Sequence, residues 1–281
     1  MAARTFTAAL SQNKIVDQKF VVHNIPGAQG ALALRELAKR KGDPYVLLSM
    51  PEYADGLWDG TLKDLSLSDF SPVAQVATDY LVLVVRADSP YKTAIEVLDK
   101  LKEDPSSMVI PLAGPMKSGE GLKWYELANK YGLNLDEMNF VPHDGANPAL
   151  TSLLSGYGDV AFTTISIADD HILSGNLRVL AVMTEKRIEN RESLKDAPTM
   201  IEQGVDITAY RPRGFWLAGG VSEEVVKFWE DAFKQILETP EYKEYVQKAG
   251  LLAEFRPREE YIKYIQETGS LYSEYVQTLG E

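Results

Sequence analysis

The spacing of apolar residues along the chain predicts helices and short strands in alternation. Phe6, Ala9 and Leu10 recur at helical intervals near the N-terminus. Beyond them, short apolar runs typical of buried strands alternate with longer amphipathic stretches. The expected strands cover residues 19–25, 45–50, 80–87 and 108–114, and the expected helices cover residues 31–42, 93–103 and 121–133. Strands that alternate with helices in this way favour parallel α/β sheets.

The pattern changes in the last third of the chain. Residues 206–220 form an extended stretch, and the remainder from Val221 onward has a helical pattern with apolar faces that include Trp229 and Phe233. No repeat or low-complexity linker divides the chain. A late helical tail that returns to cover the first sheet predicts two lobes, one of residues 1–108 plus 219–281 and the other of residues 109–218.

Composition narrows the classes of function. The 281 residues are 45% hydrophobic, enough for two ordinary domains, and 41 acidic against 29 basic residues give a net charge of −12. That sign disfavours a nucleic-acid partner, because phosphate backbones attract basic surfaces. The absence of cysteine excludes disulfides, thiolate catalysis and cysteine-bound metals. No apolar stretch approaches the ~20 residues that a membrane span needs, and no export signal is recognisable in this sequence.

Patterns typical of catalysis are weak. No G-x-S-x-G nucleophile turn occurs, and the histidines His23, His143 and His171 are scattered. A metal-assisted hydrolase that uses His143, His171 and the neighbouring Asp144 and Asp170 is the enzymatic alternative, since imidazole and carboxylate suit zinc or iron. Their spacing matches no metal motif. We therefore expect no catalytic residues, no metal and no cofactor, and a protein that recognises a ligand without chemistry.

Four loops are candidates for ligand binding, because each follows a strand and α/β sheets place ligands there. In residues 144–149 an Asp-Gly turn leads to Asn147 and Pro148, which we expect to cap and to begin a helix whose first N–H groups receive an anion. An ordinary strand-to-helix connection without a ligand is the alternative. The candidate residues of the other three loops are Ser49, Lys117, Ser118, Gly119, Thr163, Thr164 and Ser166.

Five separated segments carry a resemblance to one family. They read FVVHNIPGAQGALALRELAK, FVPHDGANPALTSLLSGYGDVAF, ILSGNLRVLAVMTEKRIE, DAPTMIEQGVDIT and RGFWLAGGVSEEVV. In this order and spacing they resemble the solute-binding receptors of tripartite tricarboxylate transporters, the TctC or Bug family. The resemblance extends over nearly the whole chain from Phe20 onward.

The resemblance implies an α/β fold of the periplasmic-binding-protein type, with two domains, each a sheet flanked by helices, and a ligand cleft between them. It implies Venus-flytrap closure around a small organic anion, a di- or tricarboxylate or a related carboxylic acid, and its delivery to the membrane permease subunits of a tripartite tricarboxylate-type transporter. It also implies a monomer that is periplasmic or extracellular and membrane-associated. A sensor subunit of the same fold, which signals ligand occupancy, is the alternative.

The resemblance assigns the ligand carboxylate to the loop of residues 144–149. The implied contacts are Asp144, Gly145, Ala146 and Asn147, with Thr163, Thr164 and Ser166 on the neighbouring wall. Lys117, Ser118 and Gly119 match a family loop in position. Family members begin with a strand and a proline- and glycine-rich loop before the helix that MAARTFTAAL resembles. We expect this sequence to be a trimmed or misplaced-start form, without the loop that normally supplies half of the carboxylate clamp.

Overall fold

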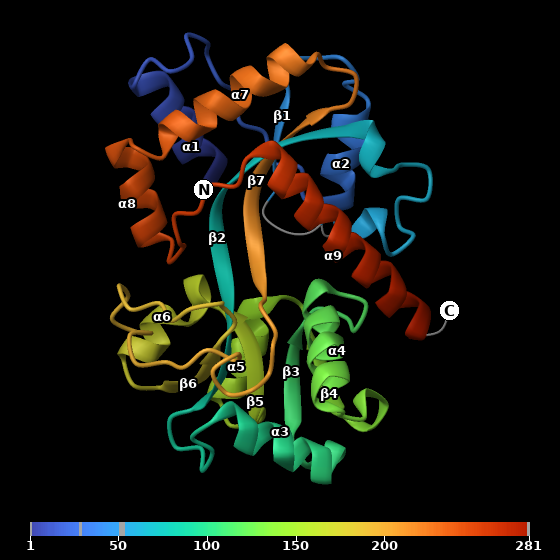
Figure 1. Cartoon of the computed structure of the whole chain (residues 1–281), viewed down its shortest axis with the longest axis vertical. Helices are drawn as coiled ribbons and strands as arrows, with labels where there is room; N and C mark the ends of the chain where they lie inside the picture. The colour runs from blue at the N-terminus through green and yellow to red at the C-terminus, as the bar shows by residue number, and fades with distance from the viewer. Residues whose placement is uncertain (1, 28–29, 51–53, 280–281) are drawn as a thin grey trace. The chain divides into compact units, whose positions relative to one another are not determined.

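The computed structural model describes residues 2–27, 30–50 and 54–279 of the chain, which divides into two compact units (Figure 1). Unit 1 contains residues 1–78 and 211–281, and unit 2 contains residues 79–210. The expected lobe boundaries at 108/109 and 218/219 therefore differ from those of the structure. The reason is the helix of residues 94–103, which buries Val97, Leu98 and Leu101 in the core of unit 2 together with Trp124.

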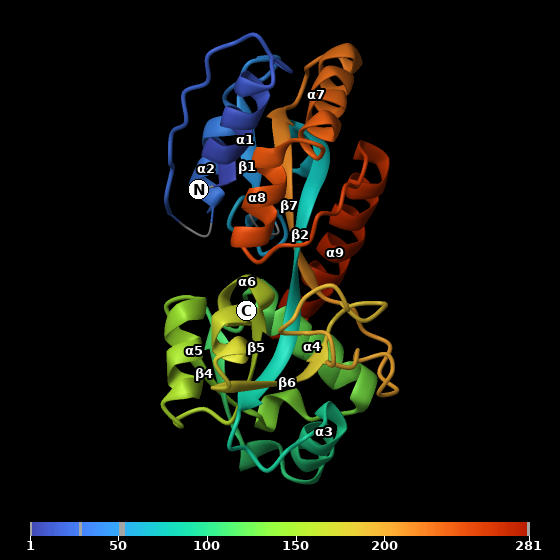
Figure 2. The ribbon, with the colours of Figure 1, turned by 90° about the vertical axis from the view of Figure 1, so that its left-hand side faces the viewer.

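Unit 1 consists of a small sheet with helices on both sides (Figures 1 and 2). Its helices are α1 (Ala2–Gln12), α2 (Ala31–Ala38), α7 (Glu223–Ile236), α8 (Pro240–Lys248) and α9 (Arg258–Thr278). Strand β1 (Leu47–Met50) pairs with β7 (Tyr210–Ala218) in antiparallel register, and β7 lies beside β2 (Phe70–Arg86). Short 3₁₀ turns at Asp55–Leu57 and Leu67–Asp69 connect these strands.

Aromatic side chains fill the core of unit 1. Phe215 of β7 stacks on Phe233 of α7 with ring centroids 4.2 Å apart, and Phe6 of α1 meets the edge of Phe215 at 5.2 Å. On the other side of the sheet, Trp216 donates its indole N–H to the buried Tyr261 hydroxyl at 3.1 Å. The apolar helical face expected around Trp229 and Phe233 therefore lies in the core.

One expected strand of unit 1 is not formed. Residues 19–25 have extended backbone but belong to no strand, and Val21 is 76% exposed. Apolar residues satisfy the strand pattern there, but a strand also needs a neighbour that accepts its backbone hydrogen bonds. The sequence PGAQG at residues 26–30 predicts a turn, and its residues 28–29 lie outside the described residues.

Unit 2 contains most of the strand-to-helix connections. Its helices are α3 (Ala94–Glu103), α4 (Gly119–Tyr131), α5 (Ala146–Leu154) and α6 (Ile165–Leu173), and its strands are β3 (Val109–Ala113), β4 (Asn139–His143), β5 (Val160–Thr164), β6 (Leu177–Val182) and the second part of β2. Short 3₁₀ turns cover Pro105–Ser107 and Leu135–Glu137. In both views α3 lies at one end of this unit and α6 at the other (Figures 1 and 2).

The expectation of parallel sheets is confirmed only in part. Strands β3 and β4 pair in parallel, but β5 and β6 both pair with β2 in antiparallel register. The long strand β2 supplies its first part to unit 1 and its second part to unit 2, so it runs through both units without a crossover helix. Parallel pairing needs a crossover connection, and a strand that simply continues into the next unit does not provide one.

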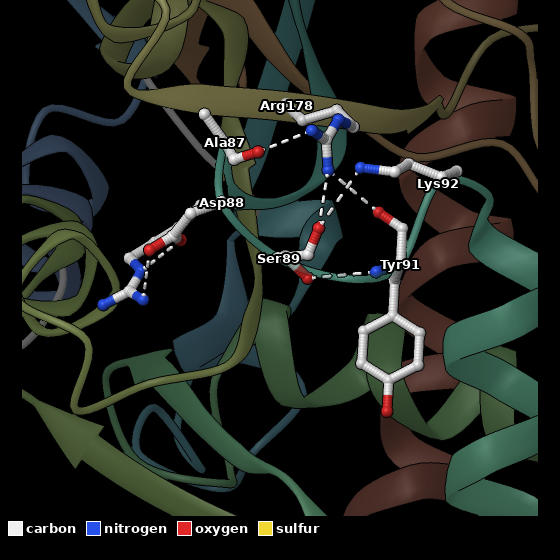
Figure 3. Close-up of polar contacts among 7 residues, drawn as sticks. Ala87, Asp88, Ser89, Tyr91, Lys92 and Arg178 are labelled. Carbon is white, nitrogen blue, oxygen red and sulfur yellow. Dashed lines mark hydrogen bonds and ion pairs between the residues drawn. The ribbon is translucent and has the colours of Figure 1, made fainter.

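The loop after β2 is fixed by one arginine of β6 (Figure 3). The guanidinium of Arg178 donates to the carbonyl oxygens of Ala87 at 2.5 Å, Ser89 at 3.0 Å and Tyr91 at 3.1 Å. A planar guanidinium with five N–H groups suits such a set of acceptors. Arg178 thus holds the loop that leads from the sheet to α3.

No helix in the described part of the chain is long and apolar enough to cross a membrane.

Candidate functional site

Strands β3, β4 and β5 of unit 2 run in the same direction, so their carboxyl ends lie on the same side of the unit. At the starts of β3 and β5, Val109 N–H donates to the Asp159 carboxylate at 2.7 Å and Asp159 N–H donates to the Val109 carbonyl at 2.8 Å. At the ends of β3 and β4, Gly114 N–H donates to the His143 carbonyl at 2.9 Å. The loops that lead into α4, α5 and α6 therefore lie along one edge, the position at which α/β sheets bind ligands.

The loop before α5 is the most open of the three. Gly145 has φ 100° and ψ 174°, a conformation that is essentially restricted to glycine, and a β-carbon there would meet nothing within 4 Å. Helix α5 begins at Ala146, so the N–H groups of Ala146 and Asn147 have no intrahelical acceptor. Asp144, Gly145 and Asn147 are exposed. These features give a helix N-terminus that a small anion can reach.

The expected cap of α5 is wrong in detail. Gly145 occupies the N-cap position and forms no side-chain cap, while Asn147 and Pro148 are the second and third helical residues. The helix starts earlier than the sequence suggested because Gly145, with its positive φ, already turns the chain into the helix. Pro148 still fits, since its missing N–H is one of those without an intrahelical partner.

In the loop before α4, the Ser118 hydroxyl forms a hydrogen bond within the protein. Ser118 is the N-cap of α4, its side chain accepts from the Gly121 N–H at 3.4 Å, and it is 5% exposed. Lys117 beside it is exposed, and Gly119 begins the helix. The loop before α4 therefore presents glycine backbone and one lysine, whereas the Ser118 hydroxyl serves the helix.

The N-terminus of α6 already holds a carboxylate of the protein itself. The Asp79 carboxylate accepts from the Ser166 hydroxyl at 2.6 Å and from the Ser166 N–H at 3.2 Å, and Thr164 lies within 3.0 Å of the same hydroxyl. Asp79 is fully buried. Sequence reasoning missed Asp79, although an aspartate inside the apolar run VATDYLVLVV was a signal, because a buried carboxylate needs hydrogen-bond donors.

Two further polar atoms at this edge are buried. Thr163 Oγ1 and His143 Nε2 have no hydrogen-bond partner in the part of the chain that the structure describes. Thr163 was expected on the wall of the site, whereas His143 had been considered only as a metal ligand. Ser49, by contrast, belongs to unit 1, where it is half-buried and pairs with Phe215 in the β1–β7 ladder.

A polar cluster of Arg191, Ser193 and Asp169 links the middle of α6 to residues 191–193. The guanidinium of Arg191 donates to both carboxylate oxygens of Asp169, at 3.0 and 2.8 Å, and Ser193 donates to one of them. The hydrogen bonds from Arg191 hold the pKa of Asp169 below its usual value. Asp169 lies in the middle of α6 and therefore does not cap this helix.

A metal site finds no support in this geometry. Within residues 2–27, 30–50 and 54–279, no group of three or more His, Asp or Glu side chains lies close enough to hold a metal ion. The set expected for a hydrolase, His143, Asp144, Asp170 and His171, therefore does not assemble.

The fold is that of a two-domain solute-binding protein. A TctC solute-binding protein from Polaromonas superposes with a TM-score of 0.83 at 24% identity, over 98% of this chain and 92% of its own. An R. palustris protein solved with adipate gives a TM-score of 0.79 at 21% identity, over 100% of this chain and 92% of its own. The fold class expected from the sequence is thus confirmed.

The family follows from the sequence itself. The family model described as "Tripartite tricarboxylate transporter family receptor" matches residues 3–280, and the chain belongs to this family. A Cupriavidus necator relative, named "UPF0065 protein in gbd 5'region", is 29% identical over 280 residues, which cover 95% of this chain and 80% of the relative.

Proposed function

We propose that this protein is an extracytoplasmic receptor that binds a small organic di- or tricarboxylate without turnover and delivers it to a tripartite tricarboxylate-type permease. The observation that carries the proposal is the open N-terminus of α5, where Gly145 leaves space in front of the N–H groups of Ala146 and Asn147. Membership of the receptor family supports the transport role, and the adipate in the R. palustris structure supports the ligand class.

Electrostatics favours α5 over α6 as the place for the ligand carboxylate. The buried Asp79 carboxylate already accepts the N–H and hydroxyl of Ser166 at the start of α6, so a second anion there would meet a like charge. At α5 the helix dipole and the first N–H groups are available. Main-chain donors of this kind also suit a protein with a net charge of −12, because the overall field of such a protein does not attract anions.

Calorimetric titration of the purified protein tests the ligand class. We expect adipate, succinate or citrate to bind, and adipamide, the neutral diamide of adipic acid, to bind at least ~100-fold more weakly because it lacks the charge that a helix N-terminus favours. Failure of all three acids to bind at millimolar concentration, or equal binding of adipamide, contradicts the proposed ligand class.

The transport role requires a separate measurement. Uptake of labelled ligand by membrane vesicles that contain the permease is expected only when the receptor and its ligand are both present. Uptake that is independent of the receptor contradicts the proposed delivery. Release of a chemically altered ligand contradicts the proposed absence of turnover.

A further inference from the structure

Three Asp-Gly sequences occur in the chain, and no Asn-Gly sequence does. They are Asp55-Gly56 and Asp59-Gly60 in unit 1 and Asp144-Gly145 in unit 2. At an Asp-Gly bond the aspartate carboxyl group can react with the next amide nitrogen, because glycine has no β-carbon to hinder their approach. Whether the two groups are free to meet depends on the contacts of each turn.

The two Asp-Gly turns of unit 1 are held by the surrounding chain. The carbonyl of Gly56 accepts from the Leu62 N–H at 2.7 Å, and a β-carbon on Gly56 would lie 3.2 Å from the Leu62 side chain. In the second turn, the Asp59 carboxylate accepts from the Thr61 N–H at 2.7 Å. An Asx turn of this kind keeps the carboxylate in one orientation. In both turns, contacts within the fold thus restrict the movement that the reaction needs.

The Asp-Gly turn before α5 has fewer restraints. Asp144 and Gly145 are both exposed, and the Asp144 carboxylate forms no hydrogen bond or ion pair with any residue in the described part of the chain. A β-carbon on Gly145 would meet nothing within 4 Å, so this side of the glycine is open. The Gly145 N–H donates to the carbonyl of His143 at 2.9 Å. That hydrogen bond lies within the loop and leaves the Asp144 side chain unrestrained.

We propose that Asp144 is a site of spontaneous isomerisation to isoaspartate. In the first step the Gly145 nitrogen forms a bond to Asp144 Cγ, and one carboxyl oxygen leaves as water with the carboxyl proton and the amide proton. In the second step water adds to the main-chain carbonyl carbon of Asp144, the bond from that carbon to the Gly145 nitrogen breaks, and the nitrogen regains its proton. The chain then continues through Cγ. Water is the only other reactant, and the mass of the protein does not change.

The isomer lengthens the main chain by a methylene group directly before α5. Gly145 is the N-cap of α5, so the first N–H groups of the helix are displaced relative to the preceding loop. The modified protein should therefore bind adipate more weakly, a consequence that rests on the proposed function. The formation of isoaspartate itself does not depend on that function.

The experiment follows isoaspartate in the full chain during storage at neutral pH. Peptide mapping with a fragmentation method that distinguishes the isoaspartyl linkage measures the modified fraction at residues 55, 59 and 144. In the folded protein, we expect isoaspartate to accumulate several-fold faster at residue 144 than at either residue of unit 1. In concentrated urea the three sites should react at similar rates, because the contacts that restrain the turns of unit 1 are then lost.

The matched control is Asp144→Glu. Glutamate keeps the carboxylate, but its attack on the same nitrogen would have to close a larger ring, so we expect no modification at residue 144 in this variant. Stored wild-type protein should lose adipate binding as its isoaspartate content rises. Stored Asp144→Glu should keep the adipate affinity that it has when freshly purified.

The outcomes separate this inference from the proposed function. If isoaspartate in the folded protein accumulates at residue 144 no faster than at residues 55 and 59, the inference is overturned. If it accumulates at residue 144 and the modified protein binds adipate like the fresh protein, the inference stands and the proposed ligand site at α5 is refuted. If the fresh wild type binds none of adipate, succinate and citrate, the proposed function fails, and the isoaspartate measurement still decides the inference.

Discussion

The substitution Gly145→Ala tests whether a side chain at residue 145 blocks the ligand site, an effect distinct from the backbone strain that the substitution also introduces. Gly145 has φ 100° and ψ 174°, a region in which a residue with a β-carbon costs about 1–3 kcal/mol. We therefore expect the free energy of unfolding to fall by about 2 kcal/mol, which corresponds to a midpoint about 4–8 °C lower in a chain of this size. The added methyl group meets no protein atom within 4 Å, so it projects into the space that the ligand is proposed to fill.

A second glycine of unit 2 provides the control. Gly204 has φ 91°, and a β-carbon there also meets nothing within 4 Å, but it follows a turn far along the chain from the three helix N-termini. Gly204→Ala should thus lose a similar stability and bind normally. Gly145→Ala should weaken adipate binding by at least ~1.4 kcal/mol, a factor of ten.

The assay is calorimetric titration with adipate, with thermal unfolding followed by circular dichroism on the same samples. Two results would refute the reasoning. If Gly145→Ala binds adipate like the wild type, the space in front of α5 is not the ligand site. If Gly204→Ala loses as much affinity as Gly145→Ala, the loss comes from general destabilisation, and the exclusion of the ligand by a β-carbon at residue 145 is refuted.

Three further predictions concern single side chains of unit 2. Arg191→Ala should cost about 1.5–3 kcal/mol at pH 7, because it removes hydrogen bonds to a charged group. Because Arg191 lowers the pKa of Asp169, this stabilisation is complete above the unfolded pKa of about 3.9 and is lost as the pH falls through the lower folded pKa. In urea unfolding, the difference in free energy of unfolding between the wild type and Arg191→Ala should therefore be smaller at pH 3 than at pH 7. An equal difference at the two pH values would contradict this prediction. Arg178→Ala should accelerate amide hydrogen exchange in residues 87–92 and leave adipate affinity unchanged. If the exchange rates of these residues do not change, the three contacts to carbonyl oxygens do not hold the loop. Asn147→Ala should change the free energy of unfolding by less than about 0.5 kcal/mol, since Asn147 is not the N-cap; a loss near 1 kcal/mol in denaturant unfolding would restore the capping role.

Local features of the sequence determined the class of fold and many of its elements. The expected helix of residues 93–103 forms as α3, and Thr93 caps it by accepting from the Glu96 N–H at 3.2 Å. The runs at residues 45–50 and 108–114 form β1 and β3. Apolar periodicity and capping residues act over a few neighbouring residues, so they can be interpreted without the rest of the chain. The family motifs likewise lie in continuous segments.

The candidate site was predictable only in part. The loop of residues 144–149 and the hydroxyls near residue 164 were located from the sequence, since loops after strands are the expected place for ligands. The sequence did not show that Asp79 occupies the start of α6. That contact depends on which side chains meet after folding, because Asp79 and Ser166 are far apart in the sequence.

Strand direction and partners were decided by the tertiary structure alone. The pairing of Val82 with Thr163 in β2 and β5 joins segments that are far apart in the sequence, and no local pattern specifies its antiparallel direction. The parallel register of β3 and β4 likewise pairs Ala113 with His143, two residues that no local pattern brings together. A pattern of apolar and polar residues determines which positions are buried, whereas the contacts between distant strands determine which polar groups converge on a ligand.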